Sequence, residues 1–170
     1  YDSRNREKGD FGYGWKLGHT DVKLTKSGRM GENWEGTTTG GGFPTLCVVP
    51  TKPHWVSITM NDGGVHKFNM AISPSCRQYY LPSPVTVSFV PDEGAFGSLV
   101  PMDITSVDVF GDAPNPVELV YDMFNPITYD PPGYRYTTRN GTKLEISVSE
   151  GIQKMIDPNG NTLTFTDAGM

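Results

Sequence analysis

Apolar and polar residues alternate along most of this chain, in short runs that end at glycine, asparagine, aspartate or proline. Within residues 84–90 the apolar positions are Val85, Val87 and Phe89, and residues 105–110 follow the same pattern. A period of two residues is typical of a β-strand with one buried face. The pattern therefore predicts a mainly β protein whose short strands pair in antiparallel sheets.

Two segments join such runs through a tight-turn sequence. Residues 55–70 contain Asn-Asp-Gly-Gly at 61–64, and residues 134–148 contain Asn-Gly at 140–141. These residue types tolerate the positive φ that tight hairpin turns require. We expect a β-hairpin at each place, and a mobile loop at the glycine- and threonine-rich residues 36–42.

Composition strengthens the β prediction. The chain has 14 Val and 17 Thr against 8 Leu and 4 Ala, and β-branched side chains favour strands whereas Ala and Leu favour helices. The nearest candidate for a helix, residues 116–124, suits a strand equally well. The 20 Gly and 14 Pro make up a fifth of the 170 residues, below the roughly 25–30% typical of disorder. We expect little or no helix and a single domain over residues 1–170.

Charge and hydropathy exclude several classes of function. The chain carries 14 basic and 19 acidic residues, a net charge of −5, so it offers no basic face for nucleic acid. No apolar stretch approaches the roughly 18 residues of a membrane-spanning helix. Because the first residue is Tyr1, we expect an internal segment of a longer protein. Cys47 and Cys76 suit either one disulfide or two buried thiols, and the sequence leaves that choice open.

The C-terminal part of the chain contains an internal repeat. A shift of 19 residues places Asn-Gly at 140–141 on Asn-Gly at 159–160, and Leu144 on Leu163. Each unit is a turn and an alternating strand, followed by a glycine turn and the start of a second strand. Such a unit cannot bury its own apolar face and needs neighbours stacked beside it. We therefore expect the sheet to continue beyond Met170.

These residues resemble the opening of an RHS (YD-repeat) array. Residues 150–169 are similar to the family's pattern, which is roughly Gly-x-Leu-x-x-Ile-x-Asp-x-x-Gly-Asn, then a strand, then Tyr-Asp-x-x-Gly. Phe-Gly-Tyr-Gly-Trp at 11–15 resembles the Phe-Gly-x-Gly-Trp motif that precedes the repeats. Thr-Asp at 166–167 stands where the family usually has Tyr-Asp, so the match is to the edge of an array rather than its middle. Residues 74–132 match the family poorly.

The resemblance implies a fold and a function. RHS and YD-repeat proteins wind a strip of β-sheet into a hollow shell, which in bacterial toxin complexes and polymorphic toxins encloses a toxic polypeptide. It implies antiparallel sheets that are sandwich-like or part of a spiralling shell, with the first repeat units at 134–170. The implied protein is an exported or cell-surface bacterial one, and the implied partners are the rest of the RHS chain and an enclosed toxin or effector polypeptide. No motif here corresponds to the family's self-cleaving carboxylates.

Candidates for catalysis or metal binding are weak. His19, His54 and His66 show no His-x-x-x-His spacing, which favours ordinary surface or strand histidines. Asp-Pro-Asn-Gly-Asn at 157–161 imitates half of a calcium-binding loop but lacks its later Gly and Glu, which favours a turn. A hydrolase is a third hypothesis, and its acidic candidates have no informative spacing: Asp92, Glu93 and Asp103. We predict no catalytic residue, no cofactor and no metal.

Aromatic residues suggest an alternative function. Trp34, Tyr79 and Tyr80 are candidates for a platform on which a sugar ring stacks. Trp34 lies between Asn33 and Glu35, which favours a surface position. The other aromatic candidates are Trp15, for which burial is favoured, Trp55, Tyr134 and Tyr136. The alternative to a non-enzymatic shell segment is therefore a carbohydrate- or cell-surface-binding β module.

Overall fold

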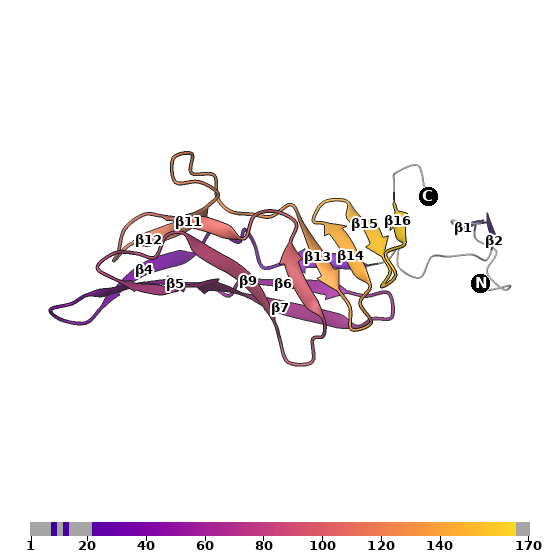
Figure 1. Ribbon diagram of the computed structural model, residues 1–170, viewed down its shortest axis with the longest axis horizontal. Coiled ribbons are helices and arrows are strands. Elements are labelled where there is room, and N and C mark those ends of the chain that lie inside the picture. The colour runs from indigo at the N-terminus through magenta and orange to yellow at the C-terminus, as the bar shows by residue number, and fades with distance from the viewer. Residues whose placement is uncertain (1–7, 10–11, 14–21, 166–170) are drawn as a thin grey trace.

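The computed structural model describes residues 8–9, 12–13 and 22–165. Within these residues the protein is all-β, with no helix, and fourteen strands form one open antiparallel sheet (Figure 1). Among the described strands, the short β1 (Lys8–Gly9) and β2 (Gly12–Tyr13) pair only with each other. The prediction of antiparallel sheets built from short strands, with little or no helix, is confirmed.

The strands of the large sheet are, in chain order, β3 (Lys23–Lys26), β4 (Trp34–Thr39), β5 (Thr45–Pro50), β6 (Trp55–Thr59), β7 (Val65–Ser73), β8 (Cys76–Gln78), β9 (Val85–Pro91), β10 (Ser98–Pro101), β11 (Ser106–Phe110), β12 (Pro116–Val120), β13 (Gly133–Thr137), β14 (Lys143–Ser147), β15 (Gly151–Ile156) and β16 (Thr162–Thr164).

Strand β9 is the branch point of this sheet. One of its edges pairs with β7, from Phe68 opposite Pro91 to Ser73 opposite Thr86. Its other edge is shared, because β11 pairs near its beginning and β10 near its end. The sheet therefore branches into three arms: β7–β6–β3, β11–β12–β4–β5–β8 and β10–β13–β14–β15–β16. The last two extend toward opposite ends of the elongated molecule (Figure 1).

The hydrophobic core lies on the inward face of the alternating strands. Val85, Val87 and Phe89 of β9 are buried, whereas Thr86 and Ser88 between them are exposed. The predicted alternation in β11 is confirmed in the same way. Each Å² of apolar surface removed from water stabilises the fold by about 25 cal/mol, so this face holds the arms together.

Both predicted hairpins form. Strands β6 and β7 are joined through Gly63, with φ of +84°, and β13 and β14 through Gly141, with φ of +88°. Glycine adopts this left-handed conformation without the steric cost that a Cβ would bring. The turn residues at these two places therefore set the register of the paired strands.

The 19-residue repeat corresponds to two equivalent turns. The N–H of Gly141 donates to the carbonyl of Thr138 at 3.1 Å, and 19 residues later the N–H of Gly160 donates to the carbonyl of Asp157 at 3.0 Å. The φ of Gly160 is +90°, close to that of Gly141. The first turn joins β13 to β14 and the second joins β15 to β16, so one repeat is one hairpin long.

The prediction of a mobile loop at residues 36–42 is wrong for residues 36–39. Residues 36–39 belong to β4, which pairs with β5 as far as Thr39 opposite Thr45. The threonines here are β-branched and suit a strand. The loop itself begins at Gly40.

Candidate functional site

Trp34 is a core residue, so the prediction that it lies at the surface is wrong. Its side chain is 3% exposed and its ring stacks on that of His54, with centroids 4.6 Å apart. The indole N–H donates to the carbonyl of Met30 at 2.9 Å. Trp34 therefore cannot contribute to a sugar-stacking platform.

Tyr79 and Tyr80, the other two predicted platform residues, lie at the surface. They are 58% and 53% exposed, and the structure adds two neighbours, Phe43 and Arg77. The ring of Phe43 meets that of Tyr79 edge to face, with centroids 6.3 Å apart, and the Arg77 guanidinium lies 4.6 Å from the centre of the Tyr80 ring. We call Phe43, Arg77, Tyr79 and Tyr80 the aromatic patch.

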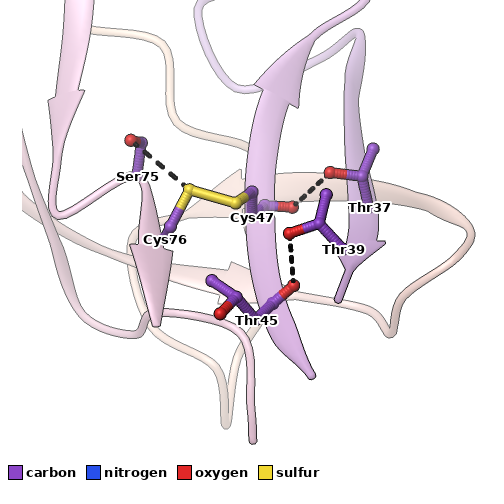
Figure 2. Close-up of a disulfide and its surroundings, with 6 residues drawn as sticks. All are labelled: Thr37, Thr39, Thr45, Cys47, Ser75 and Cys76. Carbon is purple, nitrogen blue, oxygen red and sulfur yellow. Dashed lines mark hydrogen bonds between the residues drawn. A yellow bond between two sulfur atoms is a disulfide. The ribbon is translucent and has the colours of Figure 1, made fainter. Parts of the chain in front are cut away.

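The aromatic patch is attached to the edge of the β4–β5 hairpin. Strand β8 is only three residues long and, within the described residues, pairs with β5 alone. Cys47 of β5 and Cys76 of β8 lie directly opposite each other and form a disulfide bond (Figure 2). Of the two possibilities that the sequence left open for these cysteines, the structure therefore has the disulfide. It fixes β8, the strand that carries Arg77.

The backbone also positions the patch. The N–H of Tyr79 donates to the carbonyl of Pro44 at 2.9 Å, which holds Tyr79 beside the residue that follows Phe43. Tyr79 itself has a φ of +70°, in the left-handed region that residues with a Cβ rarely adopt. The hydroxyls of Thr37 and Thr39 on β4 donate to carbonyls of β5 and add further links within this hairpin (Figure 2).

The remaining aromatic candidates do not join the patch. Tyr134 and Tyr136 are fully buried in the core. Trp55 is partly exposed on β6, with the Lys67 ammonium 5.5 Å from its ring centre. Trp15 lies outside the described residues.

Histidine, cysteine and acidic side chains in the part of the chain that the structure describes do not converge on a metal site. Within residues 8–9, 12–13 and 22–165, no group of three or more such side chains is close enough to hold an ion. His54 is buried against Trp34, and His66 stacks on Tyr136, with ring centroids 5.6 Å apart. His19 lies outside the described residues.

The calcium-like sequence at residues 157–161 forms a turn, as predicted. The Asp157 carboxylate accepts hydrogen bonds from the backbone N–H groups of Asn159 and Asn161 and from the Asn161 side-chain amide. The Asn161 amide contributes most to lowering the pKa of Asp157. Both carboxylate oxygens therefore serve the turn itself.

Two of the acidic residues considered for a hydrolase, Asp92 and Asp103, accept hydrogen bonds from the backbone beside them. The Asp92 carboxylate accepts a hydrogen bond from the backbone N–H of Glu93 at 2.9 Å and lies 3.5 Å from the Lys67 ammonium. The Glu93 bond is the main cause of the lowered pKa of Asp92. An acid with a lowered pKa is ionised at neutral pH and is a poor proton donor. Asp103 accepts a bond from the backbone N–H of Ile104.

A cluster of tyrosines was not expected from the sequence. Tyr129 and Tyr134 are fully buried, and Tyr121 packs edge to face on Tyr129 with ring centroids 5.2 Å apart. Burial raises the pKa of all three, that of Tyr121 to about 12. They therefore stay protonated at neutral pH. Nearby, the Lys26 ammonium pairs with the Asp130 carboxylate, which connects β3 to this cluster.

Comparison with known proteins identifies no relative. No protein-family model, no curated protein and no solved structure matches the chain. Among the described residues, no helix has the length and apolar character needed to cross a membrane. The aromatic patch and the open edges of the sheet are therefore the features from which a function can be inferred. Sequence reasoning found Tyr79 and Tyr80 but missed Phe43, because its proximity to Tyr79 depends on the pairing of β5 with β8. It also missed Arg77, which precedes Tyr80 by only three residues, and that spacing was the available signal.

Proposed function

We propose that this chain is a non-enzymatic wall segment of an RHS-type β-shell that encloses or presents a toxin or effector polypeptide. The proposal starts from the resemblance of residues 11–15 and 150–169 to that family. The observation that carries it is the arm β13–β16, where repeated hairpins build a sheet whose apolar face is less covered toward its edge.

That apolar face can be followed across the strand pairs. Tyr136, Leu144, Met155 and Leu163 lie directly opposite one another on β13, β14, β15 and β16. Tyr136 and Leu144 are buried, whereas Met155 and Leu163 are only partly buried. A row of apolar side chains that becomes exposed at a sheet edge favours the addition of further strands there.

The proposed mechanism is containment. A continuous hydrogen-bonded sheet leaves few backbone groups open to water or to a protease, so a polypeptide behind it is protected. Within the described residues, β16 pairs only with β15, so its outer edge is available for the next strand of the shell. The disulfide between Cys47 and Cys76 supports an exported or cell-surface location, since disulfides persist in oxidising compartments.

The test adds one further hairpin to the chain at the sheet edge formed by β16. With a one-residue slip in the 19-residue repeat, Gly-Met at 169–170 aligns with Gly-Ile at 151–152, so a copy of residues 153–169 is appended after Met170. We expect amide hydrogen exchange in β15 and β16 to slow by about tenfold or more, because the new strand protects the edge. The control carries the same extension with its apolar strand residues replaced by serine.

Two results would contradict the proposal. One is that β16 amides of the original chain already exchange as slowly as those of β13. The other is that the copied and serine-substituted extensions leave the exchange of β15 and β16 equally unchanged.

A further inference from the structure

The aromatic patch is built from parts of the chain that carry no carboxylate. Residues 36–61 and 63–91 contain no Asp or Glu, although the whole chain has a net charge of −5. The charged side chains within these two segments are all basic: Lys52, Lys67 and Arg77. Lys67 pairs with Asp92, so Arg77 is the charged side chain that the aromatic patch itself contains. A cation set beside exposed aromatic rings favours an anionic ligand.

Arg77 is available to such a ligand. Among the described residues its guanidinium has no ion-pair or hydrogen-bond partner, and its one recorded contact is the ring of Tyr80 at 4.6 Å. A guanidinium that stacks on an aromatic ring keeps its N–H donors in its own plane. Those donors can bind both oxygens of a carboxylate at once.

The rings of the patch offer open faces beside this cation. Phe43 is 71% exposed, and the planes of Phe43 and Tyr79 stand at 79° to each other, an edge-to-face contact that covers one face of one ring and leaves the others open. Arg77 covers Tyr80, which is nevertheless 53% exposed. An exposed aromatic ring presents an apolar face, and the tyrosines add a hydroxyl that binds polar groups at its rim.

The patch is also held in place before any ligand arrives. The disulfide fixes β8, and the bond from Tyr79 to Pro44 connects the tyrosines to the loop that carries Phe43. Fixing the backbone that carries these side chains in advance lowers the entropy lost on binding.

We propose that Phe43, Arg77, Tyr79 and Tyr80 form a binding site for an acidic saccharide, a sugar chain that carries a carboxylate such as that of a uronic acid. The apolar face of a sugar ring packs on the tyrosines, and its carboxylate pairs with Arg77. The site lies on the arm that points away from β16 (Figure 1), so it is independent of the proposed extension of the sheet.

The experiment uses an array of carboxylated, sulfated and neutral oligosaccharides, followed by calorimetry with the strongest carboxylated ligand and its neutral counterpart of the same length. We expect the carboxylated ligand to bind about tenfold more tightly than the neutral one, and Arg77→Gln to remove that difference. Binding should weaken as salt is raised, because the pair is exposed. Tyr80→Ala should weaken both ligands.

Arg139→Gln is the matched control, because Arg139 also stacks on an exposed ring, that of Phe96, at 3.4 Å. This variant should bind like the original protein. The proposal is overturned if no carboxylated sugar binds better than its neutral counterpart, or if Arg77→Gln and Arg139→Gln bind equally well. Tighter binding of an oligothymidylate that is lost in Arg77→Gln would replace the saccharide with a single-stranded nucleic acid. Melting temperatures of all variants establish that each is folded.

Discussion

In the described part of the chain, the core around Trp34 of β4 offers no acceptor for a second proton on the buried His54 ring. Its Nε2–H donates to the carbonyl of Glu32 at 2.7 Å, so Nδ1 carries no proton in the neutral ring. Nδ1 is buried and has no hydrogen-bond partner among the described residues. Burial lowers the pKa of His54, because protonation would place a second donor where nothing accepts it.

We predict that acid destabilises the fold through His54. The folded-state pKa is below the ordinary value of 6.5, so the unfolded chain binds the proton more tightly. The contribution of His54 is therefore complete above that value and is lost as the pH falls below it. His54→Gln keeps a donor toward Glu32 but does not titrate. Urea unfolding between about pH 7.5 and 5 should show a smaller pH dependence in this variant, by at most about 1.4 kcal/mol per pH unit. Equal pH dependence would contradict this prediction.

Gly31 is a second residue on which the packing depends. Its N–H donates to the carbonyl of Tyr129 at 2.7 Å, and its carbonyl accepts from Leu119 at 2.9 Å. A Cβ at this position would lie 2.2 Å from the carbonyl oxygen of Leu119 and 2.7 Å from the backbone nitrogen of Tyr129. Both are backbone atoms, so neither can move aside as a flexible side chain can.

Gly31→Ala should therefore lower the free energy of unfolding by about 3 kcal/mol, since overpacking at rigid atoms forces the strands apart. Gly41→Ala is the control, because a Cβ there meets nothing within 4 Å. Denaturant unfolding measures both. A loss in Gly31→Ala no larger than in Gly41→Ala would show that the Gly31 contact is not tight.

The wrong prediction that Trp34 lies at the surface also comes from the way in which its immediate neighbours were interpreted. Asn33 and Glu35 are polar, but neighbours in a strand point to the opposite face, so they say nothing about the face that Trp34 occupies. The informative partner was His54, twenty positions away in the sequence and stacked on the indole in the fold.

At the scale of elements, strand β8 depends most on a covalent link. It is three exposed residues long and has one pairing partner among the described strands, and a strand so short is held by few hydrogen bonds. The disulfide between Cys47 and Cys76 closes a chain segment with a sequence separation of 29 residues. Closing such a loop in the unfolded chain stabilises the fold relative to it.

Replacing both cysteines with serine should lower the free energy of unfolding by about 2–4 kcal/mol. It should also increase amide exchange in β8 more than in β13 and β14, which lie on another arm. Thermal melts and hydrogen exchange measure the two effects. A variant that keeps its stability and the protection of β8 would show that the backbone pairing with β5 is sufficient.

Elements joined by short turns were the predictable ones. The hairpins at 55–70 and 134–148 follow from turn residues that need positive φ and from strands adjacent in sequence. The prediction of a loop at residues 36–42 was wrong for residues 36–39, because glycine and threonine content alone does not show whether a partner strand lies alongside.

At the scale of the whole molecule, the branching of the sheet at β9 creates two separate sites of interest. One arm ends at β16, with its partly uncovered apolar face, and the other ends at β8, with the aromatic patch. A segment that continues a wall at one end is free to present a ligand site at the other, so the two proposals are compatible and are tested separately.

The sequence by itself determined the β class, the alternation that buries one face of each strand, the two hairpins and the 19-residue repeat. Each of these depends on residues that are close in the chain. Only the tertiary structure decided the branching at β9, the disulfide, the burial of Trp34 and the meeting of Phe43 with Tyr79. These depend on which distant strands pair, and pairing is set by the burial of the whole apolar face rather than by any local pattern.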